Sequence, residues 1–161
     1  MLEKQMYIGG KWVDAETKDK LKVINPAYGE VFAEVPKAHK EDAEKAISAA
    51  EKAFEGWAFL SPAKRGSYLR KASDIVLERV DEIAKLMTAE QGKPYKEAAG
   101  EVEKGARILR YYAEEGERIY GRIIANEEED IESRVIYQPV GVAAAISPWN
   151  YPIELLAWKI G

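Results

Sequence analysis

Seven consecutive residues without a polar side chain, VGVAAAI at positions 140–146, constrain the fold of this chain more than any other feature. This composition is typical of a strand that is buried on both faces, as in a parallel sheet covered by helices. A loop with two prolines follows, and residues 153–160 have the composition of a helix. Because strand, loop and helix form the first half of a βαβ unit, we expect an α/β fold.

The second half of that unit has no counterpart in the sequence, which ends at Gly161. A parallel strand needs a parallel neighbour, which is reached through a right-handed crossover. The other predicted strands are short, and long helices separate them from residues 140–146. We therefore expect the chain to be the N-terminal part of a larger α/β protein, or to obtain the missing part from elsewhere.

Short strands are predicted near both ends of the helical region. Residues 7–13 predict a hairpin that turns at Gly9-Gly10, because glycine supplies the positive φ angles of tight turns. A second pair is predicted at residues 21–24 and 31–35, and a third at residues 121–125 and 133–137. An acidic run at 126–130 separates the last two strands, and it favours a solvated loop over a metal site.

Between these strands, apolar residues recur at helical spacing from Glu41 to about Tyr120. Ser61, followed by a proline, predicts a helix start, and Asp81 is a possible cap for a further helix. Gly92 predicts a helix end. Gly100, Gly105 and Gly116 lower the propensity of the last helix, so we expect other helices to approach closely there.

Composition excludes several classes of function. The sequence has no cysteine and one histidine, His39, so disulfides, thiolate metal sites, thiol nucleophiles and histidine triads are excluded within the chain. The net charge of −4 gives no reason to expect nucleic acid or an anionic membrane as a partner. With no secretory signal and no apolar run of membrane-spanning length, we expect a cytoplasmic protein.

The loop after residue 146 carries the strongest chemical signal. Ligands of open α/β sheets bind beyond the carboxyl ends of strands, where this loop is expected. Pro148 and Pro152 stiffen it, and Trp149 and Tyr151 are large anchors. Asn150 is then either a rigid N–H donor for a developing oxyanion or a structural turn residue that bonds its own backbone.

The stretch ISPWNYP at 146–152, preceded by QPVGV at 138–142, resembles the aldehyde dehydrogenase superfamily. The segments YIGGKWV, INPAYGEVFAEVP and TAEQGKPYKEAAGEV also resemble the N-terminal third of that family, in the same order. The resemblance implies the N-terminal portion of the family fold: helices and small antiparallel arm strands that lead into the first strand and helix of a Rossmann-like domain. The implied divisions are 1–120 (part of the cofactor-binding domain), 121–139 (oligomerisation arm) and 140–161 (truncated Rossmann-like core).

Members of this family oxidise aldehydes to carboxylic acids with NAD or NADP, and the resemblance implies a semialdehyde or a small aliphatic aldehyde as substrate. A cysteine thiolate attacks the carbonyl carbon, and a glutamate activates the water that releases the acid. The implied oxyanion donor is Asn150. The implied cofactor-binding residues are Ile146, Ser147, Pro148 and Trp149, and the implied substrate-binding residues are Tyr151, Leu155 and Trp158.

Other positions leave alternatives open. Glu154 departs from the family pattern and is either a solvent-facing helix residue or a polar group that affects substrate choice, and the role of Lys159 is open. Leu155 and Trp158 are explained nearly as well as core residues. Because the nucleophile is absent, we expect the chain to be inactive alone, and the complete enzyme to be a homodimer or homotetramer. The alternative is a non-catalytic oligomerisation module derived from the family.

Overall fold

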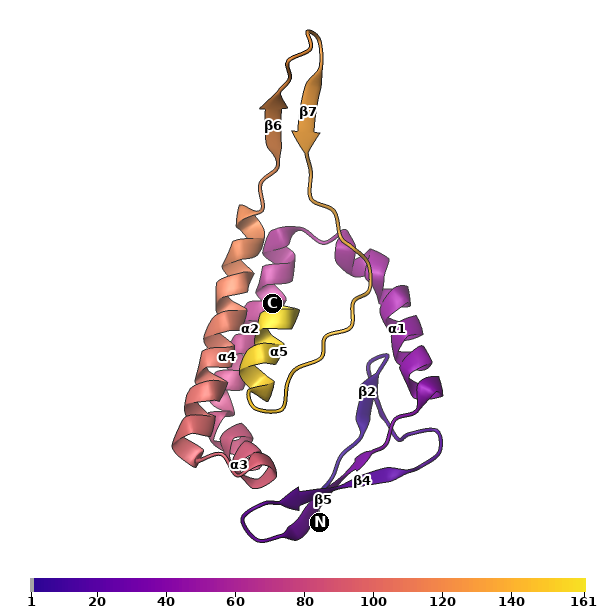
Figure 1. Ribbon diagram of the computed structural model, residues 1–161, viewed down its shortest axis with the longest axis vertical. Coiled ribbons are helices and arrows are strands. Elements are labelled where there is room, and N and C mark those ends of the chain that lie inside the picture. The colour runs from indigo at the N-terminus through magenta and orange to yellow at the C-terminus, as the bar shows by residue number, and fades with distance from the viewer. Residues whose placement is uncertain (1) are drawn as a thin grey trace.

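The computed structural model describes residues 2–161 and divides them into a helical bundle, a strand-rich region and a projecting hairpin (Figure 1). The helices are α1 (Lys40–Ala58), α2 (Pro62–Glu78), α3 (Val80–Gln91), α4 (Tyr95–Glu115) and α5 (Pro152–Ile160), with a 3-10 turn η1 (Gly116–Arg118) after α4. The strands are β1 (Leu2–Glu3), β2 (Met6–Ile8), β3 (Lys11–Val13), β4 (Lys20–Asn25), β5 (Glu30–Pro36), β6 (Arg122–Ala125) and β7 (Glu132–Val135).

The three predicted strand pairs are present. β2 and β3 form a hairpin through Gly9 and Gly10, whose φ angles are +59° and +80°. β4 and β5 pair antiparallel, and β1 adds to β5 in parallel, an addition that the sequence patterns did not predict. β6 and β7 pair antiparallel, and the acidic run 126–130 lies exposed in the turn between them, as predicted.

Helix boundaries follow the sequence signals with two corrections. The Ser61 side chain accepts a hydrogen bond from the backbone N–H of Lys64, so Ser61 is the N-cap of α2. α3 ends at Gly92, which adopts the left-handed conformation with φ +75°. The cap of α3 is Arg79 and not Asp81, which lies inside the first turn. α4 ends at Glu115 and not near Tyr120, because a 3-10 turn follows it.

The core lies where α4 meets the other helices of the bundle. One cluster of buried residues joins α3 to α4, and a second joins α4 to α5. Ala98, Val102 and Ala106 of α4 are fully buried. The close contacts involve small residues. A Cβ atom on Gly105 would lie 3.0 Å from the Ile153 side chain, so α5 approaches α4 closely at this glycine, as predicted. Gly100 and Gly116 have open space around them, so the prediction that another helix approaches closely was wrong at these two glycines.

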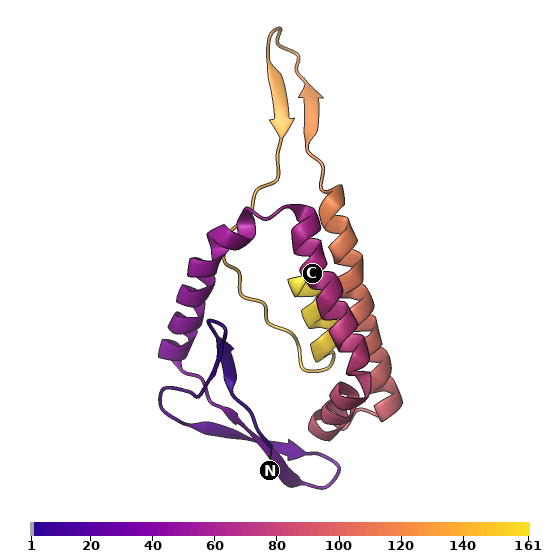
Figure 2. The ribbon, with the colours of Figure 1, turned by 180° about the vertical axis from the view of Figure 1, so that it is seen from behind.

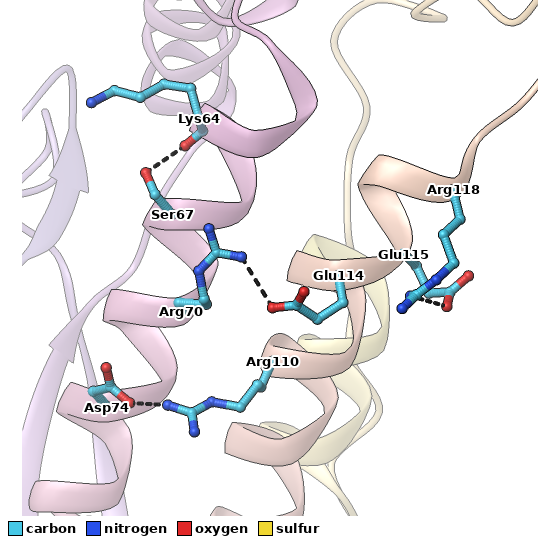
Figure 3. Close-up of polar contacts among 8 residues, drawn as sticks. All are labelled: Lys64, Ser67, Arg70, Asp74, Arg110, Glu114, Glu115 and Arg118. Atoms are coloured by element: carbon cyan, nitrogen blue, oxygen red, sulfur yellow. Dashed lines mark hydrogen bonds and ion pairs between the residues drawn. The ribbon is translucent and has the colours of Figure 1, made fainter.

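Polar contacts join α2 to α4 along their exposed edge (Figure 3). Arg70 Nη1 lies 3.0 Å from Glu114 Oε1, and Arg110 pairs with Asp74 one turn further along. The two ion pairs run in opposite directions, since each helix supplies one arginine and one carboxylate. Both pairs are exposed to solvent and are expected to contribute less than about 1 kcal/mol each. They favour one alignment of the two helices, while the apolar core supplies most of the stability.

Residues 140–146, which were predicted to form a buried strand, depart from the prediction. The apolar run Val140–Ile146 forms no strand, and most of it is exposed, with Val140 96% and Ile146 83% accessible. Within residues 2–161 no strand pairs with it, and backbone groups without a pairing partner cannot form a ladder. The segment runs between α1 and α5 (Figures 1 and 2), where residues 141–145 and the apolar face of α1 line an open groove.

The hairpin β6–β7 projects away from the helices in both views (Figures 1 and 2). All four residues of β6 are exposed, including Ile123 and Ile124. In the described part of the chain, no helix is long and apolar enough to cross a membrane.

Candidate functional site

The loop 147–151 connects the extended segment to α5, and α5 lies along α4. Pro152 occupies the first position of α5, where its missing N–H and fixed φ angle suit a helix start. Ala157 is buried against Ile108 and Leu109 of α4, so the apolar face of α5 anchors the helix. The short helix therefore fixes the C-terminal end of the loop.

Glu101 of α4 caps the N-terminus of α5 from outside the helix. Its Oε1 atom accepts hydrogen bonds from the backbone N–H groups of Ile153 (3.0 Å) and Glu154 (3.3 Å). These groups have no partners inside the helix, and a carboxylate also interacts favourably with the positive end of the helix dipole. The Glu101 side chain is only 2% exposed, so the carboxylate that accepts these hydrogen bonds is itself buried.

Lys93 joins Glu101 to the loop. Its ammonium group forms an ion pair with Glu101 and donates a hydrogen bond to the backbone carbonyl oxygen of Asn150 at 2.7 Å. The same nitrogen lies 4.3 Å from the centre of the Tyr151 ring, a distance typical of a cation–π interaction. The Lys93 side chain is 14% exposed.

Gln91 holds the preceding residue of the loop. Its side-chain Nε2 donates a hydrogen bond to the backbone carbonyl oxygen of Trp149. Gly92 makes the sharp turn that brings Gln91 and Lys93 to the loop, and a Cβ atom at this position would lie 2.9 Å from Pro26 Cγ. The segment 91–93, which the sequence patterns predicted only as a helix end, therefore also supports the loop.

Sequence reasoning missed Glu101, although a signal was present. Ala98 and Val102 lie on the predicted apolar stripe of α4, and Glu101 is three residues from Ala98, on the same face. Charged residues are rarely buried unless they are paired. A glutamate on a buried stripe therefore indicates a partner, although the sequence does not say which residue that partner is.

The Asn150 side chain behaves differently from that of another loop asparagine. Asn25 Oδ1 accepts a hydrogen bond from the backbone N–H of Ala27 at 2.9 Å, which is the usual structural role of asparagine in turns. Among residues 2–161, no hydrogen bond engages the Asn150 side-chain amide, and the residue is exposed. Its main chain is held by Lys93, and its side-chain N–H groups remain available to a ligand.

The predicted cofactor residues are contiguous and mostly accessible. Ile146, Pro148 and Trp149 are exposed, and Ser147 is partly buried. The predicted substrate residues separate into two groups. The Tyr151 ring lies next to Lys93, whereas Trp158 makes an edge-on contact with Tyr112, with ring centres 5.7 Å apart.

Among the remaining residues of α5, the surroundings of Glu154 exclude one of the two roles considered for it. Leu155 is partly buried and Lys159 is exposed. The side chain of Glu154 is 13% exposed and forms an ion pair with Lys104 at 2.6 Å. Glu154 is therefore not a solvent-facing residue, and its charge is balanced by α4.

Comparisons with known proteins agree with this arrangement. The chain is 43% identical to the glutarate-semialdehyde dehydrogenase of Pseudomonas putida and 40% identical to the NADP-dependent succinate-semialdehyde dehydrogenase of Escherichia coli. All of the chain aligns in both cases, with 34% and 33% of the relatives. The crystal structure of a succinate-semialdehyde dehydrogenase from Burkholderia pseudomallei superposes with a TM-score of 0.95 at 38% identity, over 99% of this chain and 33% of that one.

The chain thus spans about a third of the length of these relatives. Residues 12–161 match the family model described as "Aldehyde dehydrogenase family". The matched range includes the loop, α5 and the residues that hold them. With most of the chain matched and the fold shared, this protein belongs to the aldehyde dehydrogenase family.

Proposed function

We propose that the chain supplies the N-terminal third of an enzyme that oxidises an aldehyde to a carboxylic acid with NAD or NADP, and that Asn150 stabilises the oxyanion. One observation carries the proposal: Asn150 is held through its backbone while its side-chain amide is exposed and forms no hydrogen bond within residues 2–161. A structural asparagine, such as Asn25, uses its side chain to stabilise its own turn.

The role of Asn150 follows from the charge that the reaction creates. When a thiolate adds to the aldehyde carbon, the carbonyl oxygen gains negative charge, and an N–H donor already in place stabilises it. The chain has no cysteine, so the thiolate belongs to residues outside it. Removing one such donor typically lowers kcat about 10²–10³-fold. For the same reason, we propose that the 161 residues are inactive alone.

The accessible residues before Asn150 fit one side of a nicotinamide dinucleotide site. The exposed Ile146 and Trp149 side chains offer apolar surfaces, and Ser147 offers a hydroxyl group. We propose that Ile146, Ser147, Pro148 and Trp149 contact this cofactor, which accepts the hydride when bound. Tyr151, Leu155 and Trp158 are proposed to contact the aldehyde, for which the names of the relatives favour a semialdehyde; a small aliphatic aldehyde is the other class considered.

A chimera tests this function. Residues 1–161 are joined to the remaining two thirds of the Pseudomonas putida glutarate-semialdehyde dehydrogenase, and nicotinamide reduction is followed with a panel of aldehydes and with NAD or NADP. We expect turnover from the chimera, none from the 161 residues alone, and a large loss of kcat in the Asn150→Ala chimera. A folded chimera whose kcat is unaffected by Asn150→Ala would contradict the proposed role.

We further propose that β6–β7 pairs subunits of the complete protein. The isoleucines of β6 are exposed in a hairpin that extends away from the helices, and such strands readily pair with another chain. Sedimentation of the chimera is expected to give a dimer or tetramer, and Ile123→Lys is expected to shift it toward smaller species. A monomeric chimera would remove this part of the proposal. A cytoplasmic location remains a prediction.

A further inference from the structure

The side chains that bind the main chain of the loop come from one short segment, residues 91–93. The extended segment that enters the loop has no regular secondary structure, and Trp149 is 68% exposed. The side chains of Gln91 and Lys93 bind two consecutive carbonyl groups of the loop backbone, those of Trp149 and Asn150. These two residues lie on either side of Gly92: Gln91 is the last residue of α3, and Lys93 lies in the connection between α3 and α4.

The bond from Lys93 reaches the residue proposed to bind the oxyanion. It fixes the carbonyl group of Asn150, and therefore the peptide plane next to its Cα atom. The Glu101 hydrogen bonds fix the amides of Ile153 and Glu154, immediately beyond Pro152. The direction in which the Asn150 side chain leaves the backbone is thus constrained by Lys93 at Asn150 itself and by Glu101 at the start of α5.

Lys93 and Glu101 also depend on each other. The Glu101 carboxylate is almost completely buried, and a buried charge is strongly destabilising without a partner. Lys93 supplies the compensating charge, while the α5 amides use the other carboxylate oxygen. Loss of Lys93 would leave Glu101 with an unbalanced charge beneath the loop. Loss of Glu101 would leave the lysine without its anionic partner and the helix terminus without its cap.

We propose that Lys93 and Glu101 are positioning residues that hold Asn150 in its reactive orientation, with Gln91 as an auxiliary contact. The contacts themselves are independent of the proposed function; only the consequence for catalysis rests on it. Neither residue needs to touch substrate, because both act through the backbone of the loop and of α5.

Hydrogen exchange followed by mass spectrometry tests the structural part in the 161-residue chain. The substitutions are Lys93→Met, Lys93→Arg and Glu101→Gln, with Glu97→Gln on the exposed face of α4 as the matched control. We expect Lys93→Met and Glu101→Gln to speed exchange of residues 149–156 at least about tenfold, since the first removes a charge-assisted hydrogen bond and the second removes the negative charge that strengthens such bonds. Exchange in α2 should be unchanged, and Lys93→Arg should restore most of the protection because it keeps the cation.

The same variants in the chimera test the catalytic part. A displacement of about 1 Å at a reacting group can cost about 10²-fold in rate, so Lys93→Met should lower kcat at least about tenfold. The KM should change less than about twofold, and Lys93→Arg should recover much of kcat.

Unchanged exchange at 149–156, or equal acceleration throughout the chain, would overturn the inference. Normal kcat in the Lys93→Met chimera, alongside a loss in the Asn150→Ala chimera, would also overturn it. Failure of the proposed function is distinguishable, because it would appear as normal kcat in Asn150→Ala whatever the exchange results.

Discussion

Gly105 of α4 lies directly against Ile153 of α5, so that a Cβ atom on the glycine would lie 3.0 Å from Ile153 Cγ2. This contact lets α5 approach α4 closely enough for Glu101 to reach its N-terminal amides. We expect Gly105→Val to lower the free energy of unfolding by about 1–3 kcal/mol, as overpacking typically does. Gly100→Ala is the matched control: its surroundings are open, and it should raise that free energy by about 0.5–1 kcal/mol through helix propensity. Urea unfolding followed by circular dichroism measures both, and equal stability of the two variants would contradict the assigned packing.

Gly66 marks a close approach of α2 to α4. A Cβ atom on it would overlap the backbone carbonyl oxygen of Ala113, which cannot rotate away as a side chain can. Although alanine is the better helix former, Gly66→Ala is expected to lower the free energy of unfolding by about 1–3 kcal/mol. Thermal unfolding checks the prediction. A melting temperature at or above that of the parent chain would show that the helices separate there without penalty.

The candidate site was only partly predictable from the sequence, for reasons visible in individual residues. Ser61 and Gly92 act within a few residues of their own position, so local patterns locate them. Glu101 acts on Ile153, more than 50 residues away, and local patterns carry no information about such pairs. The run Val140–Ile146 has the composition of a buried strand, yet composition does not supply the neighbouring strand that a ladder needs.

The carboxylate of Asp42 predicts how stability depends on pH. It accepts hydrogen bonds from the backbone N–H groups of His39 and Glu16, both at 3.0 Å, and these bonds lower its pKa, that from His39 most strongly. The unfolded pKa of aspartate is about 3.9. Because the folded pKa is lower, the contribution of Asp42 is fully present above that unfolded value and is lost as pH falls through the folded pKa.

In the Asp42→Asn variant, the free energy of unfolding should therefore differ less between neutral and acidic pH than it does in the parent chain. Urea unfolding between neutral pH and the onset of acid unfolding measures it, and Asp130→Asn in the exposed turn is the control. An unchanged pH dependence in Asp42→Asn would mean that the two amides do not stabilise the charged form.

Asn150 and Asn25 give the sharpest comparison between the amide proposed to bind the oxyanion and a structural amide. Aspartate can accept the hydrogen bond that Ala27 donates to Asn25, so Asn25→Asp should leave kcat of the chimera unchanged. Aspartate at 150 has no N–H donor when ionised, and its negative charge would repel a developing oxyanion. Asn150→Asp should therefore lower kcat by at least the roughly 10²–10³-fold expected for loss of one oxyanion donor. Steady-state kinetics of both variants with one aldehyde decides the matter: a chimera that tolerates Asn150→Asp as well as Asn25→Asp would show that the reaction does not use an N–H donor at this position.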